Sequence, residues 1–148
     1  MDEILQLLPH RPPFLFVDRI SARSADHIET SWLVREDLEC FRGHYPGRPV
    51  LPGVLICEHA IQSGALLLAL GAAASTQLTT DQAPVLTQIS LARFRRMVSP
   101  GETLTTSVRL LEQAGVARRL AATVVCQQAR VAHIEFTVAR AKVPLLPS

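Results

Sequence analysis

The residues best suited to chemistry lie within the stretch 41–62, which begins as a loop rich in glycine and proline and continues as the longest apolar run of the chain. His44 lies in the loop and Glu58 lies in the apolar run. An unperturbed imidazole has a pKa of ~6.5, so a loop histidine is suited to act as a general base near neutral pH. A carboxyl group can act as the matching general acid. The pair therefore indicates proton-transfer chemistry.

Both residues also have a plainer interpretation. His44 could be held in the loop by structural hydrogen bonds, and Glu58 could be a surface residue stabilised by the positive end of a helix dipole. The neighbours of Glu58 are mostly apolar, however, and burial raises the pKa of a carboxyl group, as a general acid requires. Gln62 follows four residues later on the same helical side, where its amide could orient the carboxyl group.

Gly53 stands near the predicted start of the helix. An amide N–H at this position has no acceptor within the helix and carries the positive end of the helix dipole. Because glycine has no side chain, a substrate carbonyl could approach this N–H, as in an oxyanion hole. The glycine could equally serve turn geometry, and the two roles are compatible.

The other candidates are weaker. His59 points about 100° away from Glu58 around the helix, so we expect it to pack in the core or at an interface. Cys57 has no basic neighbour that would lower its thiol pKa and is interpreted as a small buried residue. No serine nucleophile elbow, phosphate-binding loop or HExxH motif is present, and no metal site is expected. The histidines that lack partners in sequence are His10, His27 and His133.

The spacing of apolar residues predicts one long helix and about six strands. Residues 54–73 contain no proline and are apolar on nearly every helical face, which is typical of a buried helix. Gly64 in this helix suggests a close approach of other backbone, and residues 74–83 are predicted to form a loop. Two early strands and four late strands in hairpin order are predicted at Phe14–Ile20, Asp26–Val34, Pro84–Phe94, Glu102–Glu112, Val116–Gln128 and Arg130–Val143. Residues 1–148 are therefore expected to form a single α+β domain, in which an antiparallel sheet covers one hydrophobic helix.

The composition narrows the class of protein. Of the 148 residues, 48% are hydrophobic, which suits one domain with a real core. A net charge of +2 is too small to indicate nucleic-acid binding. The clean apolar part of the long run is too short to span a membrane, and we do not expect the acidic N-terminus to be a signal peptide. The three cysteines form no disulfide or metal pattern, which indicates a cytoplasmic location.

Three arginines lie close together near the end of a predicted strand: Arg93, Arg95 and Arg96. Such a cluster could bind an acidic partner or could simply be a solvated strand end.

Three blocks of sequence carry a resemblance to a known family. They are LPHRPPFLFVDR at 8–19, GHYPGRPVLPGV at 43–54, and ARFRR at 92–96 followed by PGE at 100–102. In order and spacing they resemble the beta-hydroxyacyl-acyl carrier protein dehydratases of the FabZ type, and together they span most of the chain. The interval of 14 residues between His44 and Glu58 (58 − 44) also matches that family. Glu rather than Asp at position 58 favours the FabZ type over the FabA type, whose members also isomerise the double bond.

The resemblance implies a hotdog fold, in which a curved antiparallel sheet wraps around a central helix. It implies a homodimer at least, commonly a trimer of dimers, and neither a cofactor nor a metal. The active site would lie at the dimer interface, with the histidine from one subunit and the carboxylate from the other.

The resemblance also implies a reaction, the dehydration of beta-hydroxyacyl thioesters on acyl carrier protein to trans-2-enoyl thioesters in fatty-acid, related lipid or polyketide synthesis. His44 would remove the C2 proton and the Gly53 amide would polarise the thioester carbonyl. Glu58 would protonate the departing hydroxyl group, with Gln62 helping to place it. The three arginines would dock the carrier protein or its phosphopantetheine, and the tunnel for the acyl chain could be lined by Ile61 and Leu68.

Several positions depart from the family pattern, and they bear on substrate identity and tunnel shape rather than on the reaction. Tyr45 replaces the usual Phe, Ser90 replaces the usual Asp, and His59 and Ile61 replace smaller or plainer residues. Two other functions are considered, an acyl-thioester hydrolase of the hotdog fold and a non-catalytic acyl-binding assembly partner. Chain-length preference, the pathway served, any isomerase activity and the choice between dimer and hexamer are left open.

Overall fold

A computed structural model describes residues 1–74 and 82–143 of the chain. The helices in these residues are α1 (Asp2–Leu7), the short 3-10 helix η1 (Glu39–Arg42) and α2 (Gly53–Ala74). The strands are β1 (Arg19–Arg23), β2 (His27–Leu33), β3 (Gln82–Phe94), β4 (Thr103–Ala114), β5 (Ala117–Cys126) and β6 (Ala129–Lys142). The core of the predicted 74–83 loop, residues 75–81, lies outside the described residues.

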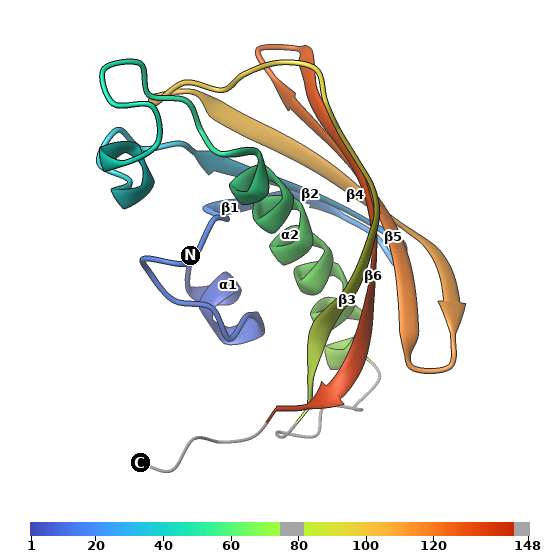
Figure 1. The fold of residues 1–148 in the computed structure, drawn as a ribbon. Helices are drawn as coiled ribbons and strands as arrows, with labels where there is room; N and C mark the ends of the chain where they lie inside the picture. Colours follow the sequence, from blue (N-terminus) through green and yellow to red (C-terminus); the bar gives the residue numbers. More distant parts are fainter. Residues whose placement is uncertain (75–81, 144–148) are drawn as a thin grey trace.

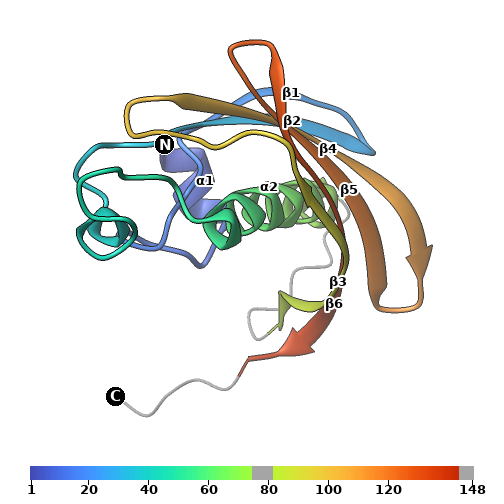
Figure 2. The ribbon, with the colours of Figure 1, turned by 45° about the horizontal axis from the view of Figure 1, so that its top comes forward.

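The described strands form an antiparallel sheet in the order β1-β2-β4-β5-β6-β3, which curves around α2 (Figure 1). In the turned view α2 lies in the hollow of the sheet, and α1 lies beside it on the side that the sheet leaves open (Figure 2). This arrangement is the hotdog fold, so the predicted α+β class is confirmed. A helix surrounded in this way must be apolar on most faces, which explains the composition of α2.

The prediction of hairpin order was correct for β4, β5 and β6 but wrong for β3. Instead of pairing with β4, β3 pairs with β6 at one edge of the sheet. The predicted turn around Pro100 is the reason, because it belongs to a longer crossing segment. The Gly101 N–H donates to the Val34 carbonyl (2.7 Å) and the Val34 N–H donates to the Glu102 carbonyl (2.9 Å). These bonds carry the chain across to β2, and β4 therefore starts beside β2.

The strand predicted at Phe14–Ile20 was wrong for most of its length, because the described strand β1 begins only at Arg19. The backbone of Phe16 is used by side chains of α2 instead. Its N–H donates to Oε1 of Gln62 (2.9 Å), and its carbonyl accepts from Nδ1 of His59 (2.6 Å). Backbone groups engaged in this way cannot form a strand ladder. Bonding to β2 begins only with Asp18, whose N–H donates to the Ser31 carbonyl (2.9 Å).

Helix α2 lies close to the sheet at Gly64. A Cβ atom built on Gly64 would lie 2.8 Å from the ring of Phe136, so only glycine fits. The close approach is made by the Phe136 side chain of β6, so the expectation that other backbone approaches here was wrong. By length and composition residues 53–73 could cross a membrane, yet 61% of the apolar window is buried inside the protein, as in the core helix of a folded domain.

Candidate functional site

His44 is held in the loop between η1 and α2 in a defined orientation. Its Nδ1 lies 2.7 Å from the carbonyl oxygen of Val50. A carbonyl only accepts hydrogen bonds, so Nδ1 carries the hydrogen and Nε2 of the neutral ring keeps its lone pair. Tyr45 packs edge-on against the ring, with centroids 4.6 Å apart. The structural hydrogen bond and the base role, posed as alternatives from sequence, are thus compatible.

Gly53 opens α2 beside His44. The Pro52 carbonyl accepts the N–H groups of Leu55 and Ile56, and among the described residues no acceptor is recorded for the Gly53 N–H. A Cβ atom at this position would lie 3.1 Å from the ring of Phe94. Close packing against Phe94 therefore accounts for the glycine, while its amide remains available at the positive end of the helix dipole.

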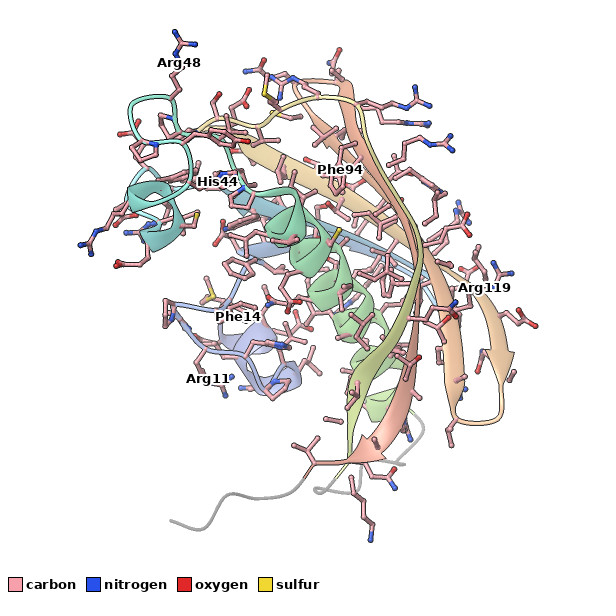
Figure 3. All side chains as sticks on the ribbon, viewed as in Figure 1. Arg11, Phe14, His44, Arg48, Phe94 and Arg119 are labelled. Atoms are coloured by element: carbon pink, nitrogen blue, oxygen red, sulfur yellow. The ribbon has the colours of Figure 1, made fainter. Side chains whose placement is uncertain are left out.

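His44 and Gly53 line the same cavity, which has a volume of about 540 Å³. Its other walls come from the loop, the first turn of α2 and the end of β3, namely Tyr45, Val50, Leu51, Ile56, Phe94, Arg95, Arg96 and Met97. Figure 3 shows His44 and Phe94 near the start of α2, whereas Arg11 and Phe14 lie beside the N-terminal segment, farther along the helix. His44 and Gly53 are therefore brought together at one cavity, while their roles as base and oxyanion donor stay predictions.

Glu58 lies on a different side of α2 and is not among the residues lining this cavity. Its Oε1 accepts a hydrogen bond from Nε2 of Gln62 (3.0 Å), which confirms the predicted contact between these two residues. Gln62 is itself buried and fixed, because Oε1 of Gln62 accepts from Phe16 and Nε2 of Gln62 also donates to the Phe14 carbonyl (3.2 Å). The Glu58 side chain keeps 21% of its surface exposed, so its burial is only partial.

The three clustered arginines have different surroundings. Arg95 is exposed and lines the His44 cavity, and Arg93 is exposed on β3. Arg96 is less exposed, and its guanidinium group makes a two-bond ion pair with Glu102, at 2.5 and 3.2 Å. This pairing raises the pKa of Arg96 and lowers that of Glu102. Arg96 thus has a structural partner, which sequence proximity did not indicate.

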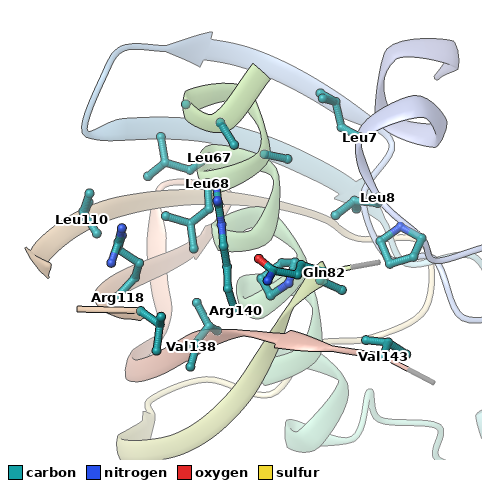
Figure 4. Close-up of a pocket in the computed structure, with 18 of the residues that line it drawn as sticks. Leu7, Leu8, Leu67, Leu68, Gln82, Leu110, Arg118, Val138, Arg140 and Val143 are labelled. Carbon is teal, nitrogen blue, oxygen red and sulfur yellow. The ribbon is translucent and has the colours of Figure 1, made fainter. Parts of the chain in front are cut away.

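A second cavity, of about 790 Å³, lies between α1, the later turns of α2 and the strands around it (Figure 4). Its wall includes Leu8, Leu67, Leu68 and Val138, with Arg118 and Arg140 also facing it. Leu68 therefore lines an apolar cavity and Ile61 does not line this one, so the acyl-tunnel role of both residues stays a prediction.

Two features of the site were missed in the sequence. Phe94 and Met97 line the His44 cavity, although they come from the end of β3 and the segment after it. His10, which has no partner nearby in sequence, lies next to Glu58, with 3.6 Å between Nε2 and Oε1. The only available signal was that both Phe94 and His10 fall within the recognised sequence blocks. Among the described residues, no group of three or more His, Cys, Asp or Glu side chains could hold a metal ion.

Comparison with known proteins assigns the family. Residues 8–135 match the model of the FabA-like domain. The chain belongs to the FabA-like family. One relative is the 3-hydroxyacyl-(acyl-carrier-protein) dehydratase FabZ of Syntrophotalea carbinolica, 43% identical over 113 residues that cover 74% of this chain and 72% of that protein. The protein of the same name from an Anaeromyxobacter species is 36% identical over 137 residues, covering 92% of this chain and 86% of the relative.

Solved structures agree on the fold of this FabA-like chain. The dehydratase heterocomplex ApeI:P from Xenorhabdus doucetiae superposes with a TM-score of 0.81 at 17% identity, covering 94% of this chain and 91% of that one. A thioesterase from Haemophilus influenzae superposes with a TM-score of 0.60 at 20% identity, covering 84% and 78%. At such low identities the likeness shows the fold alone.

His59 is a polar side chain in the core of this FabA-like domain. It is fully buried, donates from Nδ1 to the Phe16 carbonyl and lies 2.8 Å from the Thr106 hydroxyl through Nε2. Because the first bond fixes the hydrogen on Nδ1, Thr106 must donate to Nε2. Burial lowers the pKa of His59 from 6.5 to about 4, so the ring is neutral in the folded state. Its predicted packing role is confirmed.

This buried ring makes stability depend on pH. Between pH 6.5 and about pH 4 the unfolded chain binds a proton at His59 that the folded protein does not bind. Burying neutral His59 therefore carries no protonation penalty above pH 6.5, the pKa of His59 in the unfolded chain. The free energy of unfolding decreases as the pH falls from 6.5 toward 4. Lowering the pH from about 7 to about 5 should reduce the free energy of unfolding by on the order of 2 kcal/mol through His59. Urea unfolding of wild type and His59→Gln checks this. The variant should be less stable at pH 7 but less sensitive to pH, and an equal pH slope would contradict the assignment.

Proposed function

We propose that this protein dehydrates beta-hydroxyacyl thioesters on acyl carrier protein to trans-2-enoyl thioesters. Its relatives are named 3-hydroxyacyl-(acyl-carrier-protein) dehydratases, which supports the proposal. The observation that carries the proposal is the cavity in which His44 and Gly53 meet, with Nδ1 of His44 tied to Val50 and the Gly53 amide unpaired among the described residues. That arrangement supplies a base with a fixed lone pair next to a donor for a developing oxyanion.

Four residues take part in the proposed reaction. Nε2 of His44 takes the C2 proton, which is acidic because the neighbouring thioester carbonyl accepts a hydrogen bond from the Gly53 amide. Glu58 gives its proton to the C3 hydroxyl group, which leaves as water. Gln62 holds the carboxyl group through its 3.0 Å hydrogen bond. The proton and the hydroxyl group leave adjacent carbons, so base and acid must both face the substrate at once.

We further propose that the complete site needs two copies of the chain. His44 and Gly53 line one cavity, whereas Glu58 lies outside its lining. A second copy that places its Glu58 at this cavity would complete each site. The exposed edge strand β3 supports such an assembly, because it is 13 residues long and exposes Val85, Leu86, Ile89 and Phe94. An unprotected apolar edge strand of this length is suited to pairing with another chain.

Carrier-protein docking is proposed beside the same cavity. Arg95 lines the cavity and Arg93 lies two residues earlier on β3, so both could meet an acidic carrier protein or the phosphate of its phosphopantetheine. Arg96 remains a predicted docking residue, but its guanidinium group is already paired with Glu102 and is less available to bind the carrier protein. A reducing compartment such as the cytoplasm is also proposed, since all three cysteines are free thiols.

The acid–base roles lead to the first test of function. His44→Ala and Glu58→Gln should each lower kcat/KM for hydration of a crotonyl thioester by about 10²–10⁴-fold, because each removes one proton-transfer group. Product formation is followed by mass spectrometry, and light scattering should show unchanged oligomer mass. Tyr45→Phe, which keeps the ring contact with His44, is the matched control and should stay near wild type. If the wild type releases free thiol and never forms the hydroxyacyl product, it is a hydrolase and the proposal is wrong.

Charge reversal tests the docking surface. Arg95→Glu should reduce kcat/KM with acyl carrier protein roughly tenfold, the value of one charge-assisted hydrogen bond. Activity with a small pantetheine thioester should change much less. Arg109→Glu is the control, because Arg109 is exposed on β4 and is not among the residues that line the His44 cavity. Equal losses of Arg95→Glu on the two substrates would contradict docking at this position.

The β3 edge gives a test of assembly. The double variant Leu86→Glu/Ile89→Glu places charges on the exposed apolar side of β3 and should lower the oligomer mass measured by light scattering. Hydration activity should fall with it, because separate chains would hold incomplete sites. Leu111→Glu introduces a charge at a similarly exposed leucine on β4 (45%, against 40% for Leu86) and should leave the mass unchanged. An unchanged oligomer mass in the β3 variant would contradict an interface at β3.

A further inference from the structure

His10 is held against the proposed acid Glu58 although the two residues are far apart in sequence. Nε2 of His10 lies 3.6 Å from Oε1 of Glu58, and the two side chains are 29% and 21% exposed. The ring of Phe14 stacks on the imidazole, with an interplanar angle of 28°. The Arg11 guanidinium group fixes the turn by donating to the carbonyls of Leu5, Leu8 and His10. These contacts hold the His10 ring in a defined position beside Glu58.

The two ring nitrogens of His10 have different environments. Nδ1 is buried and has no hydrogen-bond partner, whereas Nε2 faces the Glu58 carboxyl group. A buried N–H without an acceptor is rarer and more costly than an unpaired acceptor. The hydrogen of the neutral ring therefore belongs on Nε2, pointing toward Oε1. The distance of 3.6 Å is longer than a hydrogen bond, but catalytic contacts are often long before substrate binds.

Two N–H groups thus converge on one oxygen of Glu58. Nε2 of Gln62 already donates to Oε1 at 3.0 Å, and Nε2 of His10 approaches the same atom. In a protonated carboxyl group, the oxygen that accepts hydrogen bonds is the carbonyl oxygen and the other carries the proton. Donors on Oε1 therefore leave the acidic proton on Oε2, for which no partner is recorded among the described residues.

We propose that His10 is a positioning residue for the acid step, which together with Gln62 holds Oε1 of Glu58 as the acceptor and so directs the Oε2 proton to the departing hydroxyl group. The proposal rests on the dehydratase function proposed above. The same two N–H groups also stabilise the carboxylate that remains once the proton has moved to the hydroxyl oxygen and water has left. His10 itself neither gains nor loses a proton.

The test compares two replacements of similar size. His10→Gln keeps an N–H donor and His10→Met removes it. His10→Met should lower kcat about tenfold with little change in KM, because His10 acts through Glu58 and not on the substrate, and His10→Gln should recover most of the loss. His27→Met is the control, since His27 contacts Ser107 and makes no ion pair with Glu58. Its kcat should stay at the wild-type value.

A double-mutant cycle separates positioning from a general loss of structure. In a Glu58→Gln background, adding His10→Met should cause little further loss of the residual rate, because the acid that His10 positions is already absent. Equal kcat values for His10→Met and wild type would overturn the proposal. So would a Gln variant as slow as the Met variant, or an additive cycle. Thiol release by the wild type would instead refute the dehydratase function itself, so the two failures are distinguishable.

Discussion

The backbone of Phe16 is the point on which the rest of the structure depends. Its N–H and carbonyl groups bond to Gln62 and His59, two neighbouring side chains buried on α2. These bonds hold the N-terminal segment across the helix. Leaving any of these buried partners unpaired would cost about 1–3 kcal/mol, so the segment has little freedom to move. The position of His10 beside Glu58 follows from this contact.

Helix α2 carries candidate site groups to two different parts of the structure. Its first turn carries the Gly53 amide to His44, while the next turns carry Glu58 and Gln62 to the N-terminal segment. Close packing holds both arrangements in place, because the Phe94 ring packs against Gly53 and the Phe136 ring packs against Gly64. Within one chain, His44 lines the cavity and Glu58 on the helix does not, so the proposed assembly of two chains would bring the proposed base and the proposed acid to one substrate.

The order of the strands determines which residues surround the His44 cavity. The segment after β3 crosses to β2 instead of turning into β4, and on its way the Leu51 N–H bonds to the Val98 carbonyl (2.8 Å). This crossing places Arg95 and Met97 at the His44 cavity and leaves β3 at the edge of the sheet. One change of strand order thus determines both the rim of the cavity and the edge proposed for assembly.

The sequence by itself determined the class of fold and the long buried helix, and it supplied the candidate site residues His44, Gly53, Glu58 and Gln62. These residues lie within one continuous loop and helix, where spacing alone decides which side chains share a face. Only the tertiary structure decided that β3 pairs with β6, that the backbone of Phe14 and Phe16 bonds to α2, that Phe94 packs against Gly53 and that His10 faces Glu58. Each of these contacts joins distant parts of the chain, and local periodicity shows which residues are apolar but not which distant partner they meet.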